Sequence, residues 1–454
     1  MGVSTFLGLE TALRGILAQQ RAIDVTGHNI ANASTVGYTR QRADLVTTTA
    51  LADGPSRLLG TGVDVAQYQR VRDSFIDIQL RAQTMVQGSA QAQQEGLKQV
   101  ELALSEPSDT GLSSLLGKYW AAWQNLANAP ESLATRQSLV QSAATLASGL
   151  NSLASQFTTV QAQTAQEQVS TVAQVNSIGT QITSLTGAIK SAELVGQQPN
   201  DLLDKRDALI DQLSALGNVA VSTTAGTPGT LGAIDVTIGG TTLVSDTTAT
   251  AVALPLASLT SGKLAGLQAV LDAIGTPVIG YLDKLNQLAA TLADQTNAQH
   301  ALGSDLNGAG GGAFFTTAAG NEAATLAVDP AILADPSLVA ASATGQAGDA
   351  GNALAIADLQ GAALIGGATI DAAYSQLVTQ IGSDSQQAQQ SNSNATSLVD
   401  ALTNRRQSVS GVSLDEEMAS LLQYQRGFQA SARALSAMDE MIDQLVNRTG
   451  RVGL

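Results

Sequence analysis

The sequence predicts a mainly α-helical, elongated protein in which long helices at the two ends of the chain pair as in a coiled coil. Three observations carry this fold class. Apolar residues recur at helical spacing near both termini. Aromatic residues make up only 3% of the 454 residues, and Ala, Gln, Ser, Thr and Leu dominate, which suits long helices packed through small side chains. Between the ends we expect a long antiparallel helical bundle, interrupted by one small β-rich inserted domain.

Residues 1–32 are expected to form the first helix. Apolar residues follow one another there at steps of three, four or seven residues, so they share one face. Near the end of this helix, Asn29 and Asn32 carry short amides that can cap the helix or bond to nearby backbone, and His28 suits polar packing. The candidate assembly residues of this segment are Phe6, Leu9, Leu13, Ile16, Ile23, Asn29, Ile30 and Asn32.

The last segment predicts one long helix, because its apolar pattern runs for many turns without a proline. Asp415, Glu416 and Glu417 stand at its start, where the helix dipole favours acidic groups. The candidate assembly residues of this helix are Leu414, Met418, Leu421, Phe428, Leu435, Met438, Ile442 and Leu445.

The middle of the chain is predicted from its breakers and periodicity. An extended region follows residue 41, helices follow residue 73, and Asp201 is expected to cap a further helix. Gly239 and Gly240 suit a hairpin turn between two strands. The other predicted segments are strands at 219–221, 234–238, 242–244 and 252–254, one helix at 264–300, and helical structure from 352 with possible breaks at Gly366–Gly367, Gly382 and Gly411.

This order of elements predicts three domains. Residues 1–60 with 405–454 form a terminal helical, tube-core domain; residues 61–216 with 263–404 form the helical bundle, which also holds short β and loop segments; residues 217–262 form the β-rich insertion.

The ends are not expected to be stable alone. About eight apolar side chains per end, at roughly 2 kcal/mol each, give on the order of 15 kcal/mol of burial. Fixing about 35 to 40 backbone residues costs roughly 1 to 2 kcal/mol apiece, and helix hydrogen bonds offset only part of this cost. We therefore expect the ends to become ordered when other chains cover their apolar stripes.

Charge and composition exclude several classes of protein. The net charge is −16, and residues 51–404 hold 12 basic and 29 acidic residues, a net charge of −17. Such a body offers no basic stripe to nucleic acid. The absence of cysteine excludes disulfides and thiolate metal sites. No stretch of 18 apolar residues and no cleavable signal peptide are present, so we expect no membrane insertion; if the protein leaves the cell, it does so by a route that reads no cleaved signal.

Enzyme chemistry is not expected. The chain has two histidines, His28 and His300, and no Gly-x-Ser-x-Gly elbow. The glycines Gly310–Gly312 are not followed directly by the Lys and Ser/Thr of a phosphate loop. Asp305-x-Asn307-Gly308 matches part of a calcium loop but lacks the downstream ligands, so a plain turn is expected. We predict no catalytic residues, no cofactor and no metal.

Two long motifs resemble known proteins. Residues 22–33, continuing to Gly37-Tyr38-Thr39-Arg40-Gln41, resemble the N-terminal motif of flagellar rod, hook and hook-associated proteins. Residues 410–418 and 423–430 are similar to the C-terminal motif of the same family. The ending Tyr38-Thr39-Arg40-Gln41, the segment Pro199 to Asp207 and a third stretch between Gln299 and Phe315 favour the hook-associated proteins at the junction of hook and filament.

The resemblance implies a structural adaptor that joins hook to filament in the bacterial flagellum and serves motility. It implies type III export, an extracellular position at the hook–filament junction, and self-assembly through the terminal helices. The implied partners are a ring of like subunits, the hook protein, the second hook–filament junction protein, and a cytoplasmic export chaperone on the C-terminal helix.

Two other functions stay open at this point. One is another axial protein, either a distal rod component or the second junction protein. The other is a secreted adhesin, for which residues 217–262 would be the binding part.

Overall fold

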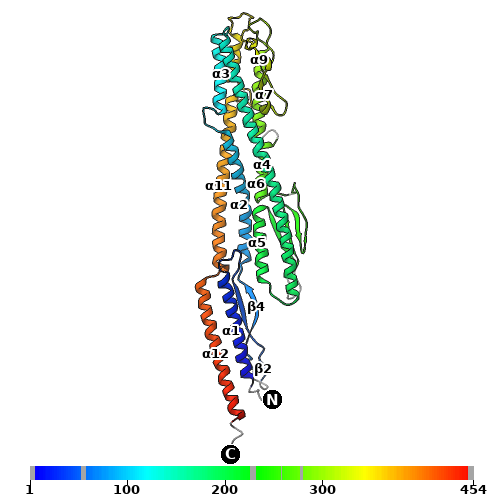
Figure 1. The fold of residues 1–454 in the computed structure, drawn as a ribbon, viewed down its shortest axis with the longest axis vertical. Helices are drawn as coiled ribbons and strands as arrows, with labels where there is room; N and C mark the ends of the chain where they lie inside the picture. Colours follow the sequence, from blue (N-terminus) through cyan, green and yellow to red (C-terminus); the bar gives the residue numbers. More distant parts are fainter. Residues whose placement is uncertain (1–5, 53–57, 225–231, 257, 277–279, 448–454) are drawn as a thin grey trace, which may run out of the picture. The chain divides into compact units, whose positions relative to one another are not determined.

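The computed structural model describes residues 6–52, 58–224, 232–256, 258–276 and 280–447, and the mainly α fold class is confirmed (Figure 1). The chain forms two compact units. Unit 1 comprises residues 1–85, 174–258 and 396–454, and unit 2 comprises residues 86–173 and 259–395. Three long helices contribute to both units: α2 (Ser74–Leu104), α4 (Leu133–Leu194) and α11 (Ile370–Ser410).

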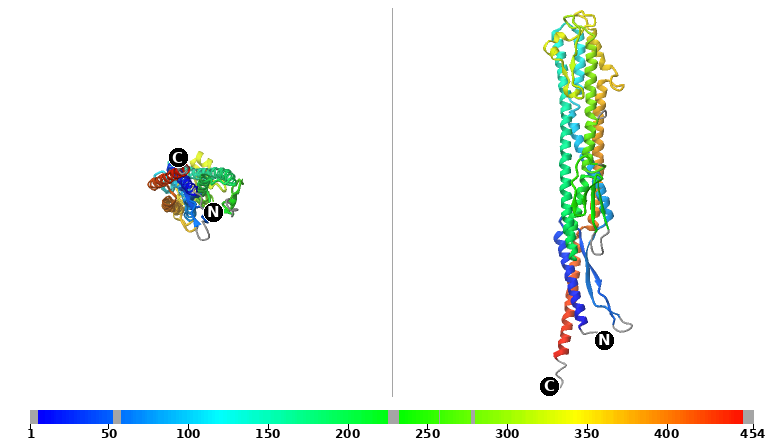
Figure 2. Two further views of the ribbon diagram at one scale, coloured as in Figure 1. Left: turned by 90° about the horizontal axis from the view of Figure 1, so that it is seen from below. Right: turned by 90° about the vertical axis from the view of Figure 1, so that its right-hand side faces the viewer.

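The terminal helices of unit 1 lie side by side, as Figures 1 and 2 both show. They are α1 (Leu7–Asn32) and α12 (Leu414–Asn447), close to the predicted bounds. A two-stranded antiparallel ladder of β1 (Gln41–Thr47) and β4 (Val63–Arg70) packs against α1, with a bulge between Asp44 and Leu45. Two short strands, β2 (Leu51–Ala52) and β3 (Leu58–Leu59), extend this ladder as a second pair. The predicted extended region is thus a β-ladder laid along the first helix.

The rest of unit 1 contains α5 (Asn200–Leu216) and a four-stranded antiparallel sheet in the order β5-β6-β7-β8. The alternating apolar residues of β6 are buried, because one face of the sheet covers α4 and Leu243 packs at the helix glycine Gly179. The predicted turn at Gly239–Gly240 is confirmed, and both glycines have positive φ. The strands are β5 (Val219–Thr223), β6 (Ile234–Ile238), β7 (Thr241–Ser245) and β8 (Thr248–Ala249).

Unit 2 is built around a helical core that contains most of the large aromatic residues. Tyr119, Trp120, Trp123, Phe314 and Phe315 are buried there and contact one another ring to ring. Its other elements are α3 (Leu112–Asn128), α6 (Lys263–Gly275), α7 (Tyr281–His300), β9 (Phe315–Thr316), α8 (Glu322–Thr325), β10 (Ala327–Val328), α9 (Pro330–Ala334), η1 (Pro336–Leu338), α10 (Gly351–Ala357) and η2 (Asp358–Gly361).

His300 lies in this core with both ring nitrogens used. Its Nδ1 is 2.8 Å from the carbonyl oxygen of Gly312, and its Nε2 accepts from the backbone N–H of Ala340 at 2.8 Å. A neutral imidazole with a proton on Nδ1 satisfies both bonds. Burial lowers the pKa of His300, with the nearby Arg136 guanidinium adding to the effect. The histidine is therefore a packing residue, satisfied in its neutral form.

Three predicted details are wrong, each for a local reason. Residues 252–254 form no strand, because the amide side chain of Asn176 on α4 bonds both the N–H and the C=O of Val252. Gly382 does not break α11, since its neighbour Ile381 is fully buried and anchors the helix. The single helix predicted at 264–300 is two helices, α6 and α7, and α6 ends two residues before a proline.

Candidate assembly site

The seam between α1 and α12 is formed by small side chains. Ala12, Ala18 and Ala22 of α1 are buried. A Cβ added at Gly15 would lie 2.9 Å from the Ser431 hydroxyl oxygen. The same close approach recurs where Gly8 faces Met438 and Gly427 faces Gln19. Small residues let the two helix backbones come close together, so the predicted pairing of the termini does not depend mainly on large apolar side chains.

The structure places the predicted assembly residues at different depths. Only Asn29 is fully buried, and side chains beyond residue 444, including that of Leu445, lie outside what the structure describes. The half-buried residues flank the seam; they are Leu9, Ile16, Ile23, Ile30, Asn32, Leu421, Phe428, Leu435, Met438 and Ile442. The exposed ones are Phe6, Leu13, Leu414 and Met418.

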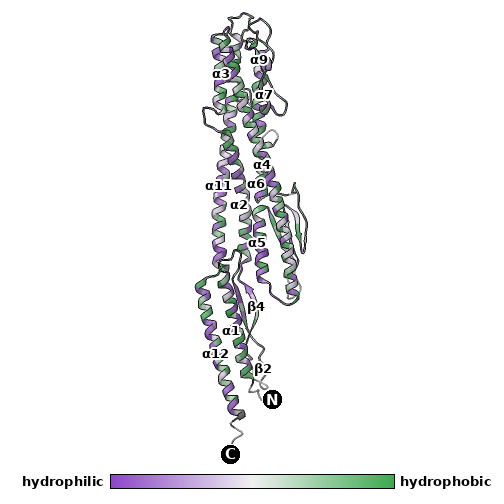
Figure 3. Cartoon of the chain, viewed as in Figure 1, coloured by the Kyte–Doolittle hydropathy of each residue, from purple (hydrophilic) through white to green (hydrophobic). Residues whose placement is uncertain are grey.

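Large apolar residues remain exposed in a row on each terminal helix. The exposed α12 row consists of Leu414, Met418 and Leu422, each at least half exposed. The exposed α1 row consists of Phe6, Leu13 and Leu17, with 61%, 45% and 44% of their surface exposed. Figure 3 shows hydrophobic residues alternating with polar ones along both helices. Large apolar residues left in water at helical spacing on two neighbouring helices are typical of a surface that another protein covers.

The sequence analysis missed Leu17 and Leu422. Each stands four residues after a predicted stripe residue, Leu13 and Met418 respectively, so the helical period could have identified them.

The Asn29 side chain makes four hydrogen bonds, one of which joins the end of α1 to the start of α12. Its side-chain Nδ2 donates to the carbonyl oxygen of Gln41 at 2.8 Å and to the Glu417 carboxylate at 3.0 Å. Its Oδ1 accepts from the backbone N–H of Gln41 at 2.9 Å and from the Tyr38 hydroxyl at 2.7 Å. The predicted bonding to nearby backbone is confirmed, and the amide additionally reaches across to the last helix.

Arg40 reinforces this connection. Its guanidinium lies 2.8 Å from Glu416 and 2.7 Å from Glu417, whose side chain is only 3% exposed. The pKa of Tyr38 is raised, first by burial and then by the neighbouring carboxylates, so its hydroxyl stays protonated and donates to Asn29. We call Asn29, Tyr38, Arg40, Gln41 and Glu417 the root cluster, because they lie where the terminal helices begin to diverge from the rest of unit 1.

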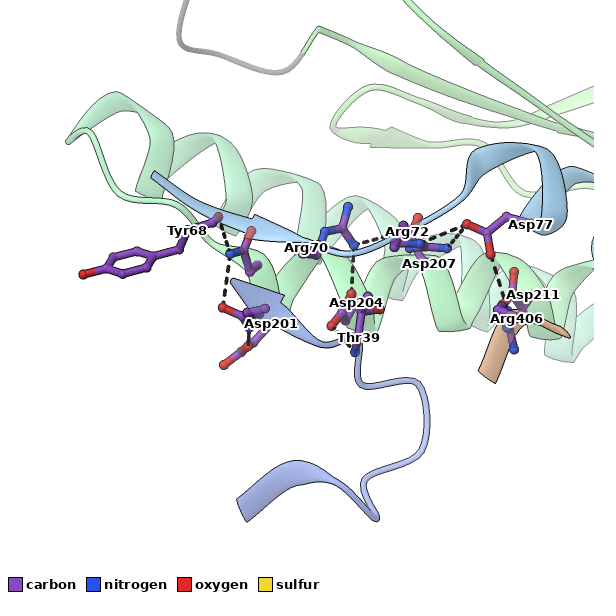
Figure 4. Close-up of polar contacts among 12 residues, drawn as sticks. Thr39, Tyr68, Arg70, Arg72, Asp77, Asp201, Asp204, Asp207, Asp211 and Arg406 are labelled. Atoms are coloured by element: carbon purple, nitrogen blue, oxygen red, sulfur yellow. Dashed lines mark hydrogen bonds and ion pairs between the residues drawn. The ribbon is translucent and has the colours of Figure 1, made fainter. Parts of the chain in front are cut away.

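A row of carboxylates on α5 receives the segments next to the root cluster (Figure 4). Asp201 accepts from the side chains of His28 at 3.3 Å and Gln41 at 2.8 Å. Asp201 lies in the first turn of α5 and makes no capping bond, so the predicted cap is wrong. Its carboxylate is turned toward the first helix and the first strand instead.

The next residues of the row bind the backbone and the arginines of the β-ladder. Asp204 is 5% exposed; it accepts from the N–H of Thr39 at 2.8 Å and pairs with Arg70 at 2.9 Å. Asp207 pairs with Arg70 at 2.8 Å and also with Arg72.

The last residue of the row, Asp211, pairs with Arg81 and Arg406, each at 2.6 Å. Asp77 of α2 lies between Arg72, at 2.7 Å, and Arg406, at 3.8 Å.

The sequence analysis did not assign this row a role, although a signal was available. Asp201, Asp204, Asp207 and Asp211 are spaced by three, three and four residues, which places them on one face of a helix. Four like charges on one face require cations from elsewhere in the chain.

The remaining candidate residues have ordinary roles. Asp305 forms the expected turn, because its Oδ1 accepts from the N–H groups of Asn307 and Ala309 at 2.8 and 2.9 Å. Asn32 is the last residue of α1 and donates to the carbonyl oxygen of His28 at 3.0 Å.

In the described part of the chain, no group of three or more His, Asp or Glu residues is arranged to hold a metal ion. None of the helices described there is long and apolar enough to cross a membrane.

Comparison with protein families gives three matches. The model described as the flagellar hook-associated protein FlgK helical domain matches residues 97–257 and 253–315. The flagella basal body rod protein model matches residues 9–39, and the flagellar basal body rod FlgEFG protein C-terminal model matches residues 405–448. The two rod-protein matches coincide with α1 and α12.

Whole-chain similarity points to the same group of proteins. The chain is 33% identical to flagellar hook-associated protein 1 of Bacillus subtilis, over 98% of this chain and 99% of the relative. It is 26% identical to the protein of that name from Escherichia coli, over 97% and 99%. The flagellar hook junction protein FlgK from Burkholderia pseudomallei shares the fold, with a TM-score of 0.62 at 20% identity over 73% of this chain and all of that one.

Proposed function

The chain belongs to the flagellar hook-associated protein 1 family and is a structural component of the bacterial flagellum at the hook–filament junction; from this premise we propose that it joins neighbouring subunits through α1 and α12. The observation that carries this proposal is the exposure of the two apolar rows while the seam between the helices is already filled by small residues. A subunit whose terminal helices are paired and still apolar on the outside has surface left for other subunits.

The proposed contacts follow from the position of the exposed rows. Like subunits in a ring would cover the exposed α1 row and the exposed α12 row, with the half-buried stripe residues at their margins. The same type of helix packing would join the hook protein on one side and the second hook–filament junction protein on the other. The proposal keeps the three domains predicted from the sequence. Residues 1–60 with 405–454 would be the assembling domain. Residues 61–216 with 263–404 would be the helical bundle, and residues 217–262 the β-rich insertion.

The proposal places the mature protein outside the cell, in the flagellum, after type III export. Before export, a cytoplasmic chaperone would cover α12, because Leu414, Met418 and Leu422 would otherwise be open to association in the cytoplasm. We assign the chain a structural role rather than an enzymatic one, in line with its relatives, which are named as hook-associated proteins.

Replacement of Leu422 tests the proposal. Leu422→Asp places a charge in the exposed α12 row, so subunits should fail to incorporate and cells should carry hooks without filaments. Leu422→Met keeps an apolar side chain of similar volume and should assemble normally. Both purified variants should retain the helix content of the parent chain, since Leu422 is 54% exposed. Filaments of normal length on cells that produce only Leu422→Asp would contradict the proposal.

A further inference from the structure

Three connecting segments of the chain meet where the terminal helices adjoin the rest of unit 1, and we call them the crossings. The first crossing leads from α1 to β1 at residues 33–40, the second leads from β4 to α2 at residues 71–73, and the third leads from α11 to α12 at residues 411–413. The orientation of the paired helices relative to the other elements of unit 1 depends on these three connections.

The three crossings are hydrogen-bonded to one another through the backbone. Arg40, at the end of the first, donates its N–H to the carbonyl oxygen of Ser410, the last residue of α11, at 3.0 Å. Val71, in the second, donates its N–H to the carbonyl oxygen of Arg40 at 2.8 Å. One residue, Arg40, therefore sits between the other two crossings.

Each crossing is also tied to the acidic row of α5, as Figure 4 shows. The first reaches Asp204 through the N–H of Thr39. The second reaches Asp207 through Arg72. The third is tied only through the helix that leads into it: Arg406, four residues before the end of α11, pairs with Asp211.

The middle of the row is mostly withdrawn from water. The side chains of Asp204, Asp207 and Asp211 are 5%, 18% and 26% exposed, whereas that of Asp201 is 53% exposed. If one crossing moved away, its carboxylate on α5 would lose one partner and keep another, because Arg70 also pairs with Asp204 and Asp207, and Arg81 with Asp211. A partly buried carboxylate loses favourable energy with each partner that is removed, so the set resists the movement of any single crossing.

We propose that the acidic row of α5 is a latch that fixes the orientation of the α1–α12 pair relative to α5 and the other elements of unit 1. Asp204, Asp207 and Asp211 are the positioning residues, and they act through Thr39, Arg72 and Arg406 on the three crossings. This inference rests on the proposed function, because orientation matters only if α1 and α12 are the assembling helices. It gives the segment Pro199 to Asp207 a physical role in the junction protein.

Adjacent arginines provide a matched test. Arg406 pairs with Asp211 and Asp77, whereas its neighbour Arg405 is exposed and makes no ion pair with any residue that the structure describes. Arg406→Gln removes the tie of the third crossing, and Arg405→Gln removes the same charge without touching the latch. Asp207→Asn releases the second crossing in a separate variant.

The full-length chain has no cysteine, so cysteines placed at the exposed positions Gln212 on α5 and Gln423 on α12 can be spin-labelled selectively. Double electron–electron resonance should give one narrow distance distribution in the parent chain and in Arg405→Gln. Arg406→Gln and Asp207→Asn should give a broader or displaced distribution. Arg406→Lys keeps a cation near Asp211, so its distance distribution should be closer to that of the parent chain.

Two results would overturn the latch: a distribution that is already broad in the parent chain, or one that Arg406→Gln and Asp207→Asn both leave unchanged. Circular dichroism checks that each variant keeps its helices, so that a general loss of structure is not mistaken for release. Leu422→Asp in the same labelled chain should keep the narrow distribution and still block incorporation. If Leu422→Asp assembles normally, the proposed function fails, while the distance measurement still decides the latch.

Discussion

Asn29 on the first helix donates a hydrogen bond to Glu417 on the last helix, across 388 positions of sequence. Both side chains are almost fully buried, and the amide is also bonded to the backbone N–H and C=O of Gln41 and to Tyr38. A single amide thus holds together the two ends of the chain and the first strand.

Removal of this amide should open the root cluster locally. Asn29→Ala leaves the buried N–H of Gln41 without its partner and leaves the Glu417 carboxylate paired with Arg40 alone, which costs about 2 kcal/mol. The amide proton of Gln41 should then exchange with solvent roughly 30-fold faster in hydrogen-exchange measurements. Asn32→Ala is the control, because Asn32 is only half-buried and donates to one carbonyl of its own helix. Equal exchange of the Gln41 amide in both variants would show that Asn29 does not hold the cluster.

The terminal helices should differ in protection along their length. The root cluster is buried and charge-paired, whereas the half near Leu9 and Met438 is held by small contacts and by half-buried apolar residues. In a dilute monomer we expect slow amide exchange near Asn29 and fast exchange near Leu9, and in the assembled flagellum slow exchange at both. Uniformly slow exchange from Leu9 to Asn29 in the monomer would refute the expectation that other chains complete these ends.

Enlarging a seam glycine should separate α1 from α12. Gly15→Val introduces a branched side chain where Ser431 leaves room for none, and such overpacking costs roughly 1–3 kcal/mol. Gly27→Val is a matched control on the same helix, because no atom lies within 4 Å of its added Cβ and valine is at least as good a helix former as glycine. Incorporation into flagella should fall for Gly15→Val and persist for Gly27→Val. If both variants failed to incorporate, or if both incorporated normally, the result would argue against close packing at the seam.

The stability of unit 2 should decrease in mild acid because of His300. Its pKa is lowered in the folded protein, mainly by burial, from an ordinary value of 6.5. The unfolded chain therefore binds a proton more readily than the folded one, so this contribution to stability is fully present above about pH 6.5. It diminishes as the pH falls from 6.5 toward the lowered pKa of the folded state.

Thermal unfolding followed from pH 7.5 to 5.5 measures this dependence. His300→Gln should be less stable at neutral pH, because the bonds to Gly312 and Ala340 are disturbed, but it should lose less stability on acidification. His28→Gln, at the other histidine, should keep the acid sensitivity of the parent chain. A parent chain equally stable across this range would contradict the assignment.

The sequence predicted the parts of the fold that depend on local periodicity. The first helix ends at Asn32 and the last begins at Leu414, as the apolar pattern and the acidic first turn indicated. The Gly239–Gly240 turn also followed from local chemistry, since both residues have positive φ. The flagellar motifs lie on these same elements, and the family comparison bears out the resemblance.

The features that sequence reasoning missed depend on contacts between distant segments. An apolar stripe marks large residues, so it did not show that Ala18 and Gly15 would form the seam. The spacing of Asp204, Asp207 and Asp211 indicates a shared helix face, but it does not say which arginines meet them. Arg70 lies 134 positions from Asp204, and Arg406 lies 195 positions from Asp211. Such pairings are set by the tertiary fold, not by local pattern.

The bond between Asn29 and Glu417 also has a consequence for synthesis of the protein. A ribosome makes the chain from its N-terminus, so α1 is complete long before the residue that must meet it has been polymerised. The root cluster can close only when translation is nearly finished, and contacts of such long sequence separation are slow to form. The architecture therefore leaves the nascent first helix without its native partner for almost the whole time that the polypeptide is being made.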